Sequence, residues 1–153
     1  MAPATSVSRR DNRGWFVAIA VLAAAGVAVS GVSLQRHYAK SASAFCDIGQ
    51  TFNCDIVNRS EYSRLMGIPV AGIGVAGYGV LLVLATLYRT RAETPTRLLL
   101  AAAVGLGFAL YLTYIERYVL GTWCILCLSS LGMIAAIAVL AGIVKVRAAD
   151  LKD

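Results

Sequence analysis

The stretch TWCILC at residues 122–127 decides the fold, because it is a Cys-x-x-Cys motif that opens an apolar run. Residues three apart share one face of a helix, so Cys124 and Cys127 can form an exchangeable disulfide or present two thiols to one ligand. Gly121 and Thr122 predict a turn and a helix N-cap before the motif. Cys124 would then lie in the first helical turn, where the helix dipole stabilises a thiolate and lowers its pKa. The alternative is that both cysteines are small apolar side chains that fill a helix seam.

The composition is that of a membrane protein. Of the 153 residues, 59% are hydrophobic and 14% are charged, and the mean hydropathy is +0.73. Soluble domains carry about 25% charged residues. The net charge of +6 could indicate a nucleic-acid partner, but the basic residues lie at the ends of apolar runs instead of forming a patch with aromatic residues. We therefore expect a small protein that crosses the membrane several times.

Four apolar runs without charged residues predict an all-α membrane protein, a bundle of four transmembrane helices. Each run approaches the roughly 20 residues that cross a bilayer. A cleaved signal peptide is the alternative for the first run, but that run is longer than the apolar part of a signal sequence. The expected parts are a cytoplasmic lead at residues 1–14, one membrane domain at 15–144 with helices at 15–34, 68–88, 98–115 and 123–144, and a cytoplasmic tail at 145–153.

The distribution of lysine and arginine predicts the orientation in the membrane. The segments that are densest in these residues are the N-terminus, the loop after the second run and the C-terminus. With four helices these three segments lie on one side, which the rule makes cytoplasmic. All four cysteines then lie on the opposite, exoplasmic side. Disulfides persist there, in the bacterial periplasm as in the lumen of the endoplasmic reticulum.

The exoplasmic loop at residues 35–67 is the only long polar segment between the runs, and it contains Cys46 and Cys54. Turn-forming residues at 47–50 and 52–53 separate the two cysteines. The segment between them is therefore able to close into a disulfide without strain.

The second half of this loop predicts a short amphipathic helix on the membrane surface. Asn58 and Ser60 offer helix caps. Tyr62, Leu65 and Met66 follow at i, i+3 and i+4, the spacing that places side chains on one helix face. Such a helix would lie in the interface with its apolar face towards the lipid.

Two cysteine pairs on one oxidising face suit a relay of thiol–disulfide exchange. The loop pair could meet a protein in the aqueous phase, and the helix pair could meet a lipid-soluble oxidant. Each exchange step transfers two electrons, which is the number that a quinone accepts as a unit. Transport of ions or solutes is disfavoured, because the apolar runs carry no charged residue or histidine at mid-depth. Glu116 lies at the end of a run, as expected for an interfacial or pairing residue.

Other uses of the cysteines stay open at this point. A structural zinc site is one of them, but Cys-x7-Cys is not the usual zinc spacing and an oxidising compartment disfavours it, so we expect no metal. Two structural disulfides in a small four-helix transporter or scaffold are the other. A disulfide that mild reductant opens and quinone restores would indicate the relay, whereas structural disulfides would resist the reductant.

The cysteine pattern resembles that of the vitamin K epoxide reductase family, and most closely its bacterial members. The similarity extends over residues 15–144. The other quinone-linked membrane oxidase family, DsbB, has its two cysteine motifs in the reverse order. The resemblance is carried by FCDIG at residues 45–49, Cys54, YL at 111–112 and CILC at 124–127.

This resemblance implies a membrane thiol–disulfide oxidoreductase that oxidises a thioredoxin-like partner, reduces a quinone and supports disulfide formation in exported proteins. By the family pattern, Cys127 is the cysteine nearest the quinone, and Cys124 is its exchange partner. Cys54 would pass electrons to Cys124. Cys46 would be the cysteine that the partner attacks.

The resemblance also implies a quinone pocket. Ser60 matches a hydroxyl residue that helps to close the loop over the quinone, with a surface N-cap as its alternative role. Trp123 either borders the pocket or anchors the chain at the membrane interface. Leu131 and the VAG sequence at residues 70–72 replace a tyrosine and an asparagine that contact the naphthoquinone in the animal enzymes. Their absence favours simple quinone reduction over epoxide reduction.

The implied electron acceptor is a quinone of the menaquinone, ubiquinone or vitamin K type. Because the sequence ends at Asp153 without a thioredoxin-like domain, we expect the redox partner to be a separate, DsbA-like protein. The resemblance to bacterial members favours a bacterial inner membrane over the endoplasmic reticulum, with both termini cytoplasmic and the cysteines periplasmic.

Overall fold

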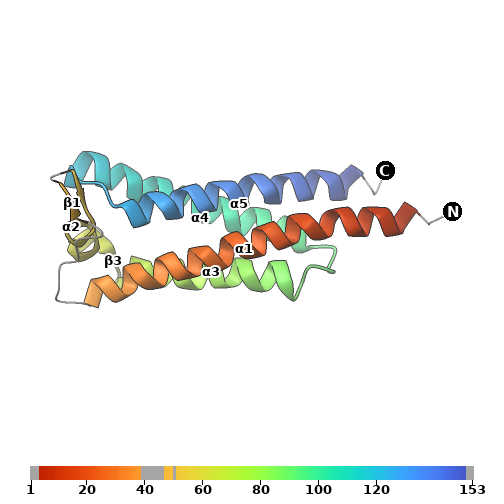
Figure 1. The fold of residues 1–153 in the computed structure, drawn as a ribbon, viewed down its shortest axis with the longest axis horizontal. Helices are drawn as coiled ribbons and strands as arrows, with labels where there is room; N and C mark the ends of the chain where they lie inside the picture. Colours follow the sequence, from red (N-terminus) through yellow and green to blue (C-terminus); the bar gives the residue numbers. More distant parts are fainter. Residues whose placement is uncertain (1–3, 39–46, 50, 151–153) are drawn as a thin grey trace.

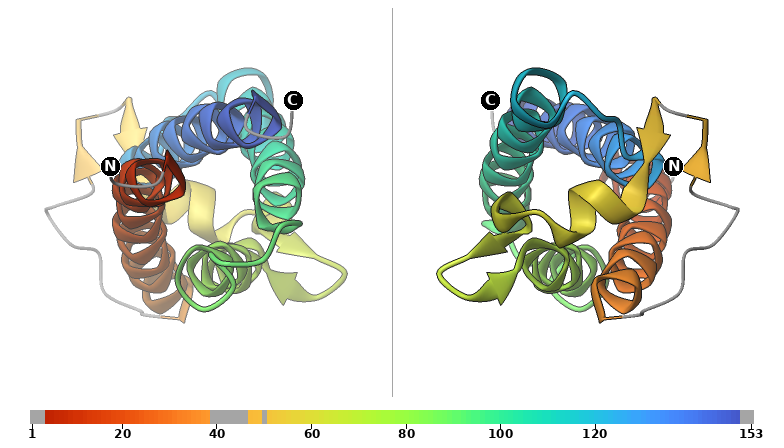
Figure 2. Two further views of the ribbon diagram at one scale, coloured as in Figure 1. Left: turned by 90° about the vertical axis from the view of Figure 1, so that its right-hand side faces the viewer. Right: turned by 90° about the vertical axis from the view of Figure 1, so that its left-hand side faces the viewer.

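Four long helices run alongside one another in a computed structural model that describes residues 4–38, 47–49 and 51–150. The helices are α1 (Ala4–Tyr38), α3 (Val70–Thr86), α4 (Thr94–Ile115) and α5 (Ile125–Asp150). Helix α1 packs against α3 and α5, and α4 packs against α5 and α3, so the four helices close a ring (Figure 2). Both chain termini lie at one end of this ring, and helix α2 lies at the other (Figure 1).

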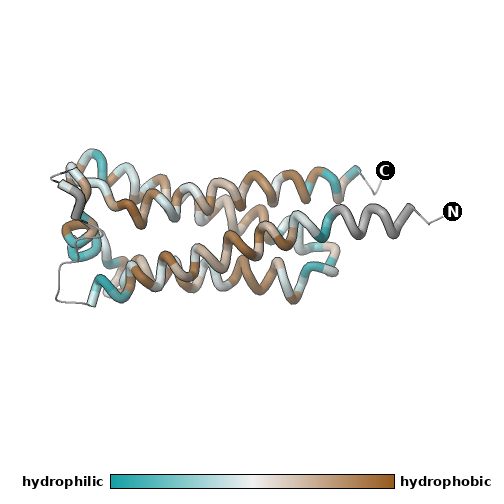
Figure 3. Tube along the Cα trace, in the orientation of Figure 1, coloured by the Kyte–Doolittle hydropathy of each residue, from teal (hydrophilic) through white to brown (hydrophobic). Residues whose placement is uncertain are grey.

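The expected apolar helical bundle is confirmed for the described residues. Three segments are long and apolar enough to cross a membrane: Asn12–Tyr38, Thr94–Leu120 and Ile125–Asp150. Helix α3 is a shorter apolar helix of 17 residues, so a fourth span stays a prediction. Brown, apolar segments fill the middle of the bundle and teal, polar ones gather towards its ends (Figure 3). Helix α1 begins before the expected apolar range because hydropathy marks the bilayer crossing and not the helix end.

The hydrophobic core fills the half of the bundle nearer the termini. Gly26 lets α1 approach α3 closely there, because a methyl group on Gly26 would lie 2.3 Å from the ring of Tyr78. The Tyr78 hydroxyl donates to the Ser130 carbonyl of α5 at 2.8 Å, so this tyrosine joins three helices. The buried residues of the core are Phe16, Ile19, Ala23, Tyr78, Leu81, Ala85, Leu98, Ala102, Ile134, Ile137, Ala141 and Val144.

The described residues between α1 and α3 form small elements at one end of the ring, where α2 lies across the opening and the short strands lie outside the four helices (Figure 2). Strand β1 (Asp47–Ile48) pairs antiparallel with β2 (Phe52–Asn53). Helix α2 (Cys54–Arg59) follows, and the Asn53 side chain caps it by accepting from the Ile56 N–H at 3.1 Å. A 3-10 turn, η1 (Glu61–Ser63), then leads to the antiparallel pair β3 (Arg64–Leu65) and β4 (Ile68–Pro69).

The prediction of an amphipathic helix containing Tyr62, Leu65 and Met66 is wrong. The short helix lies earlier in the chain, and Leu65 is in a hairpin strand. Met66 and Gly67 form the hairpin turn with φ of 54° and 86°. Two successive residues with positive φ are the geometry of a two-residue hairpin turn, which favours glycine. This turn outweighs the helical spacing of the apolar side chains.

Candidate thiol and cavity site

A π-helical segment and a glycine turn position the Cys-x-x-Cys motif. Helix α4 continues into η2 (Glu116–Leu120), a π-helix that ends at Gly121 with a φ of 63°. The Glu116 carbonyl accepts from the N–H groups of Gly121 and Thr122. Positive φ is readily adopted by glycine, and short π-helical segments are frequent at functional sites. The reversal places the first residue of η2 directly beside the cysteine motif.

Cys124 caps helix α5. The helix begins at Ile125, and the Cys124 sulfur accepts the backbone N–H of Cys127 at 3.4 Å. The expectation that Thr122 caps this helix is wrong, because the helix begins later and the Thr122 hydroxyl donates to the Leu120 carbonyl instead. Cys124 therefore lies just before the first helical turn, with its sulfur at the positive end of the helix dipole.

This position favours the thiolate of Cys124. The hydrogen bond from the Cys127 thiol is the main cause that lowers the pKa of Cys124, and the backbone N–H of Cys127 adds to it. Burial of Cys124 and the nearby Glu116 carboxylate oppose the shift without reversing it. Cys124 is therefore the thiol of this pair that is prepared for exchange.

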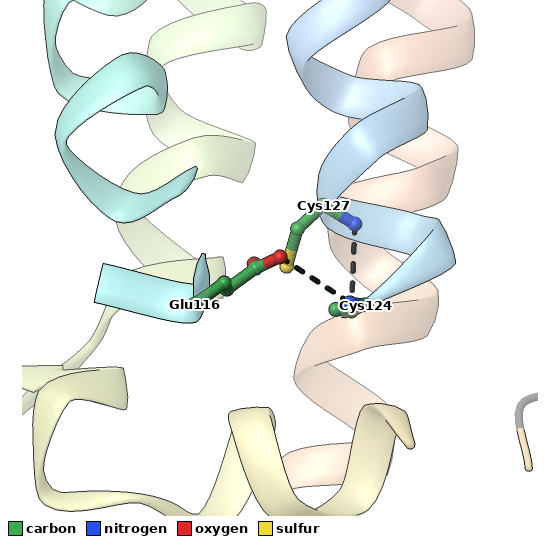
Figure 4. Close-up of side chains that lie close together, drawn as sticks. All are labelled: Glu116, Cys124 and Cys127. Carbon is green, nitrogen blue, oxygen red and sulfur yellow. Dashed lines mark hydrogen bonds between the residues drawn. The ribbon is translucent and has the colours of Figure 1, made fainter. Parts of the chain in front are cut away.

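Glu116 and the two cysteines form one group, in which Glu116 and Cys124 are buried and Cys127 is partly buried (Figure 4). Its Oε2 accepts the backbone N–H of Cys124 at 3.2 Å, and its side chain is 2% exposed. One carboxylate oxygen of Glu116 and the two sulfur atoms all lie within 4.8 Å of one another. The sequence does not reveal this role, because the contact depends on the π-helical turn and Glu116 lies eight positions before Cys124 in the chain. An acidic residue at the end of an apolar run just before a cysteine motif is the signal that points to it.

Three ligand atoms so close together could also hold a metal ion. Two thiolates and a carboxylate are ligand types that zinc accepts. Such an ion would occupy both sulfur atoms, whereas thiol exchange requires them free. Neither Cys124 nor Cys127 is in a disulfide.

Cys54 lies in the same buried cluster as Cys124. Both cysteines are fully buried, and Val57 and Leu126 complete the cluster. Cys54 is disulfide-bonded, and Cys46 lies outside the described residues. The structure thus brings one cysteine of the loop pair beside one cysteine of the helix pair.

Backbone hydrogen bonds hold this arrangement in place. The Asn53 N–H donates to the Trp123 carbonyl at 3.1 Å, and the Trp123 N–H donates to the Thr51 carbonyl at 3.0 Å. They form a short parallel bridge between Phe52 and Trp123. Because each bridge residue lies next to or near a cysteine in the chain, the bridge fixes the loop on the end of α5.

A cavity of about 430 Å³ occupies the half of the bundle nearer α2. Its wall is mostly apolar and comes from the four long helices, α2 and the segment up to Leu65. Cys127 and Glu116 line it on one side, and Ser60 also lines it. Ser60 is the C-cap of α2, and its hydroxyl donates to the Val57 carbonyl at 2.8 Å. A volume of a few hundred Å³ with few polar groups is typical of a site for a small apolar ligand.

Two residues expected at a quinone pocket are placed elsewhere. Trp123 belongs to the backbone bridge, and Leu131 is a half-buried residue of α5. Neither is among the residues that line the cavity in the described part of the chain. Their contact with a quinone stays a prediction.

Comparison with known proteins gives a family for this arrangement. The vitamin K epoxide reductase family matches residues 17–142, a range that contains all four cysteines. No curated protein matches the sequence at a significant level. Members of the family generally use a quinone and work with thioredoxin-like partners. The chain therefore belongs to the vitamin K epoxide reductase family, whose members are membrane oxidoreductases that act in disulfide formation.

Proposed function

We propose that this protein carries electrons from a thioredoxin-like partner to a quinone and so drives disulfide formation in exported proteins. One observation carries the proposal. Cys127 lines an apolar cavity inside the bundle. Cys124 is outside the cavity lining and belongs to a buried cluster with Cys54. A route for electrons thus extends from the polar loop to the cavity without passing through solvent.

The cavity is the proposed quinone site. Its wall can enclose the ring of a menaquinone, ubiquinone or vitamin K type molecule. Val70 and Ala71 line this wall where the animal enzymes have an asparagine near the start of the second helix, which agrees with quinone reduction instead of epoxide reduction. The proposed enzyme reduces a quinone to the hydroquinone and uses no metal.

The reaction at the cavity balances in electrons and protons. Oxidation of Cys124 and Cys127 forms one S–S bond and releases two electrons and two protons. Reduction of a quinone to the hydroquinone consumes the same number of each. Cys127 adds to the quinone ring through its sulfur, and the Cys124 thiolate then attacks that sulfur, so that the S–S bond forms as the carbon–sulfur bond breaks and its electron pair passes to the ring. Glu116, which faces the two sulfur atoms, accepts a proton from the Cys127 thiol and returns it towards the reduced ring.

The loop pair then reduces the helix pair. The Cys54 thiolate attacks the sulfur of Cys124 and forms a mixed disulfide, and Cys127 leaves as a thiolate. Cys46 attacks Cys54 and restores the loop disulfide, which returns Cys124 to the reduced form. A partner dithiol reduces the loop disulfide by attack at Cys46. Full burial of Cys54 and Cys124 protects the mixed disulfide from other thiols.

The proposed topology has four spans, with α3 as the second. The chain termini and the loop between α3 and α4 lie at one end of the bundle, and α2 with the start of α5 lies at the other (Figure 1). Arg89, Arg91 and Arg97 put positive charge at the first end. The positive-inside rule makes that end cytoplasmic. The cysteines would then face the periplasm of a bacterial inner membrane, where a separate DsbA-like protein could dock.

Thiol trapping in isolated membranes tests this function. The protein is reduced, the membranes are depleted of quinone, and menaquinone or ubiquinone is added without oxygen before a maleimide reagent labels the remaining thiols. We expect quinone-dependent loss of thiols in the wild type and in Ser129→Ala, a change at an exposed position of α5 outside the cavity lining. Cys127→Ala should abolish it. Thiols that stay reduced with every quinone would refute the proposal.

A further inference from the structure

Two buried side-chain polar atoms of the described residues have no hydrogen-bond partner, Asn58 Nδ2 and Glu116 Oε1. Both residues line the same cavity. Buried polar atoms are nearly always paired. Two exceptions on the wall of one cavity therefore indicate a ligand that pairs with them. Asn58 Nδ2 is a donor and Glu116 Oε1 is an acceptor. A ligand that pairs with Asn58 must therefore carry a hydrogen-bond acceptor.

The neighbours of Asn58 define which of its atoms is available. The side chain is 6% exposed, and the Ser33 hydroxyl donates to its Oδ1 at 2.9 Å. This bond orients the amide so that its NH2 group is the unpaired side. The position is fixed further by the Asn58 carbonyl, which accepts from His37 Nδ1 at 2.5 Å.

Among the residues that the structure describes, no neighbouring group competes for the amide NH2. Because a carbonyl only accepts, His37 must carry its proton on Nδ1, and its Nε2 then accepts from Arg64 Nε at 3.3 Å. The hydroxyls of Ser60 and Ser63 donate to backbone carbonyls. The cavity therefore has a donor whose position is set by its surroundings and whose partner must come from a molecule inside the cavity.

We propose that the Asn58 amide donates a hydrogen bond to a carbonyl oxygen of the quinone and so anchors its ring in the cavity. This inference rests on the proposed function. A quinone has carbonyl acceptors and no donor, so it satisfies Asn58 and leaves Glu116 Oε1 unpaired. The hydroquinone product has hydroxyl donors, one of which can pair with Glu116. The unpaired donor of Asn58 thus matches the quinone, and the unpaired acceptor of Glu116 matches the hydroquinone.

Binding of two matched ligands tests the anchor. The ligands are 2-methyl-1,4-naphthoquinone and 2-methylnaphthalene, which share a ring skeleton and differ in the two oxygen atoms. Purified full-length protein carries Cys127→Ala throughout, which prevents turnover and addition of that thiol to the ring. Asn58→Leu should weaken binding of the quinone about tenfold, equivalent to about 1.4 kcal/mol, and should leave binding of 2-methylnaphthalene unchanged.

A second pair of variants distinguishes loss of the hydrogen bond from a folding defect. Asn58→Asp keeps the size of the side chain and the acceptor for Ser33, and should lose quinone affinity selectively because a carboxylate repels the carbonyl oxygen. Asn53→Asp is the matched control, because Asn53 caps α2 outside the cavity lining and aspartate preserves the cap. It should bind both ligands like the parent protein.

The possible outcomes separate this inference from the proposed function. Quinone affinity that is unchanged in both Asn58 variants overturns the anchor and leaves the function intact. An equal loss of affinity for both ligands in both variants also overturns it, because the effect is then on cavity shape. If the wild-type thiols reduce no quinone, the proposed function fails by its own assay. Selective loss of quinone affinity establishes the anchor.

Discussion

Replacement of Glu116 by glutamine separates proton transfer from structure at the thiol pair. Glutamine has nearly the same shape, and its carbonyl oxygen can still accept the Cys124 N–H that Glu116 Oε2 accepts at 3.2 Å. It cannot accept a proton from the Cys127 thiol. If the carboxylate is the proton acceptor, Glu116→Gln should fold normally and transfer electrons to quinone slowly.

The expected effect is large enough to measure. A positioned general acid or base contributes about 10²–10⁴-fold to a rate, so we expect quinone reduction to fall at least about 100-fold in Glu116→Gln. Glu116→Leu loses the same proton acceptor and also leaves the buried Cys124 N–H without a partner. An unpaired buried donor costs about 1–3 kcal/mol. The leucine variant should therefore show the same rate loss and an additional loss of stability.

Single-turnover kinetics provide the assay. Fully reduced protein is mixed anaerobically with an excess of quinone, and the decrease in quinone absorbance is followed. Glu93→Gln is the matched control, because the Glu93 side chain is 74% exposed and pairs with Arg97 far from the thiols. A rate within about twofold of the wild type in Glu116→Gln would refute the role of the carboxylate, since the effect expected of a general base is far larger.

Two further predictions concern the thiolate and the packing of the bundle. The hydrogen bond from Cys127 lowers the pKa of Cys124, so the thiolate of Cys124 should form at lower pH than that of an ordinary cysteine, and Cys127→Ala should move the transition to higher pH. Thiolate absorbance measured against pH in protein that lacks the loop cysteines checks this, and an unchanged transition would contradict it. Gly26→Ala should destabilise the protein by about 1–3 kcal/mol through overpacking, because the added methyl group would lie 2.3 Å from the Tyr78 ring. Gly31→Ala is its control, since nothing lies within 4 Å of the added group; equal thermal stability of the two variants would contradict the packing argument.

Hydropathy predicts the long helices because burial in lipid requires continuous apolar segments. It does not predict where helices end. Helix α1 begins at Ala4 and α5 continues to Asp150, since polar residues can extend a helix beyond the bilayer. The conformation of the loop depends on local turn geometry. A hairpin that turns at Gly67 therefore forms in place of the expected amphipathic helix.

The cysteines of the candidate site are visible in the sequence, but their surroundings are not. Spacing along the chain predicts that Cys124 and Cys127 share a helix face. It cannot predict that Cys54 packs beside Cys124, because that contact depends on the bridge between Phe52 and Trp123. The same holds for Glu116, which reaches the thiols only through the π-helical turn.

Asn58 shows the limit of local interpretation most clearly. Its sequence context suggests a helix cap, yet Asn53 supplies the N-cap of α2. Asn58 lies in the last turn of that helix and is held by Ser33 and His37 of α1. Contacts between residues more than 20 positions apart therefore decide its role, and they are not encoded in local spacing.

The central claim is that electrons pass directly between Cys54 and Cys124. A double variant, Cys46→Ala with Cys127→Ala, leaves these two as the only cysteines. The measurement is the intact mass of this protein after mild oxidation in membranes and under non-reducing conditions. We predict a monomer that has lost two hydrogen atoms and has no thiol left to label, as an internal Cys54–Cys124 disulfide requires. Two reactive thiols that persist, or disulfide-linked dimers alone, would contradict the relay.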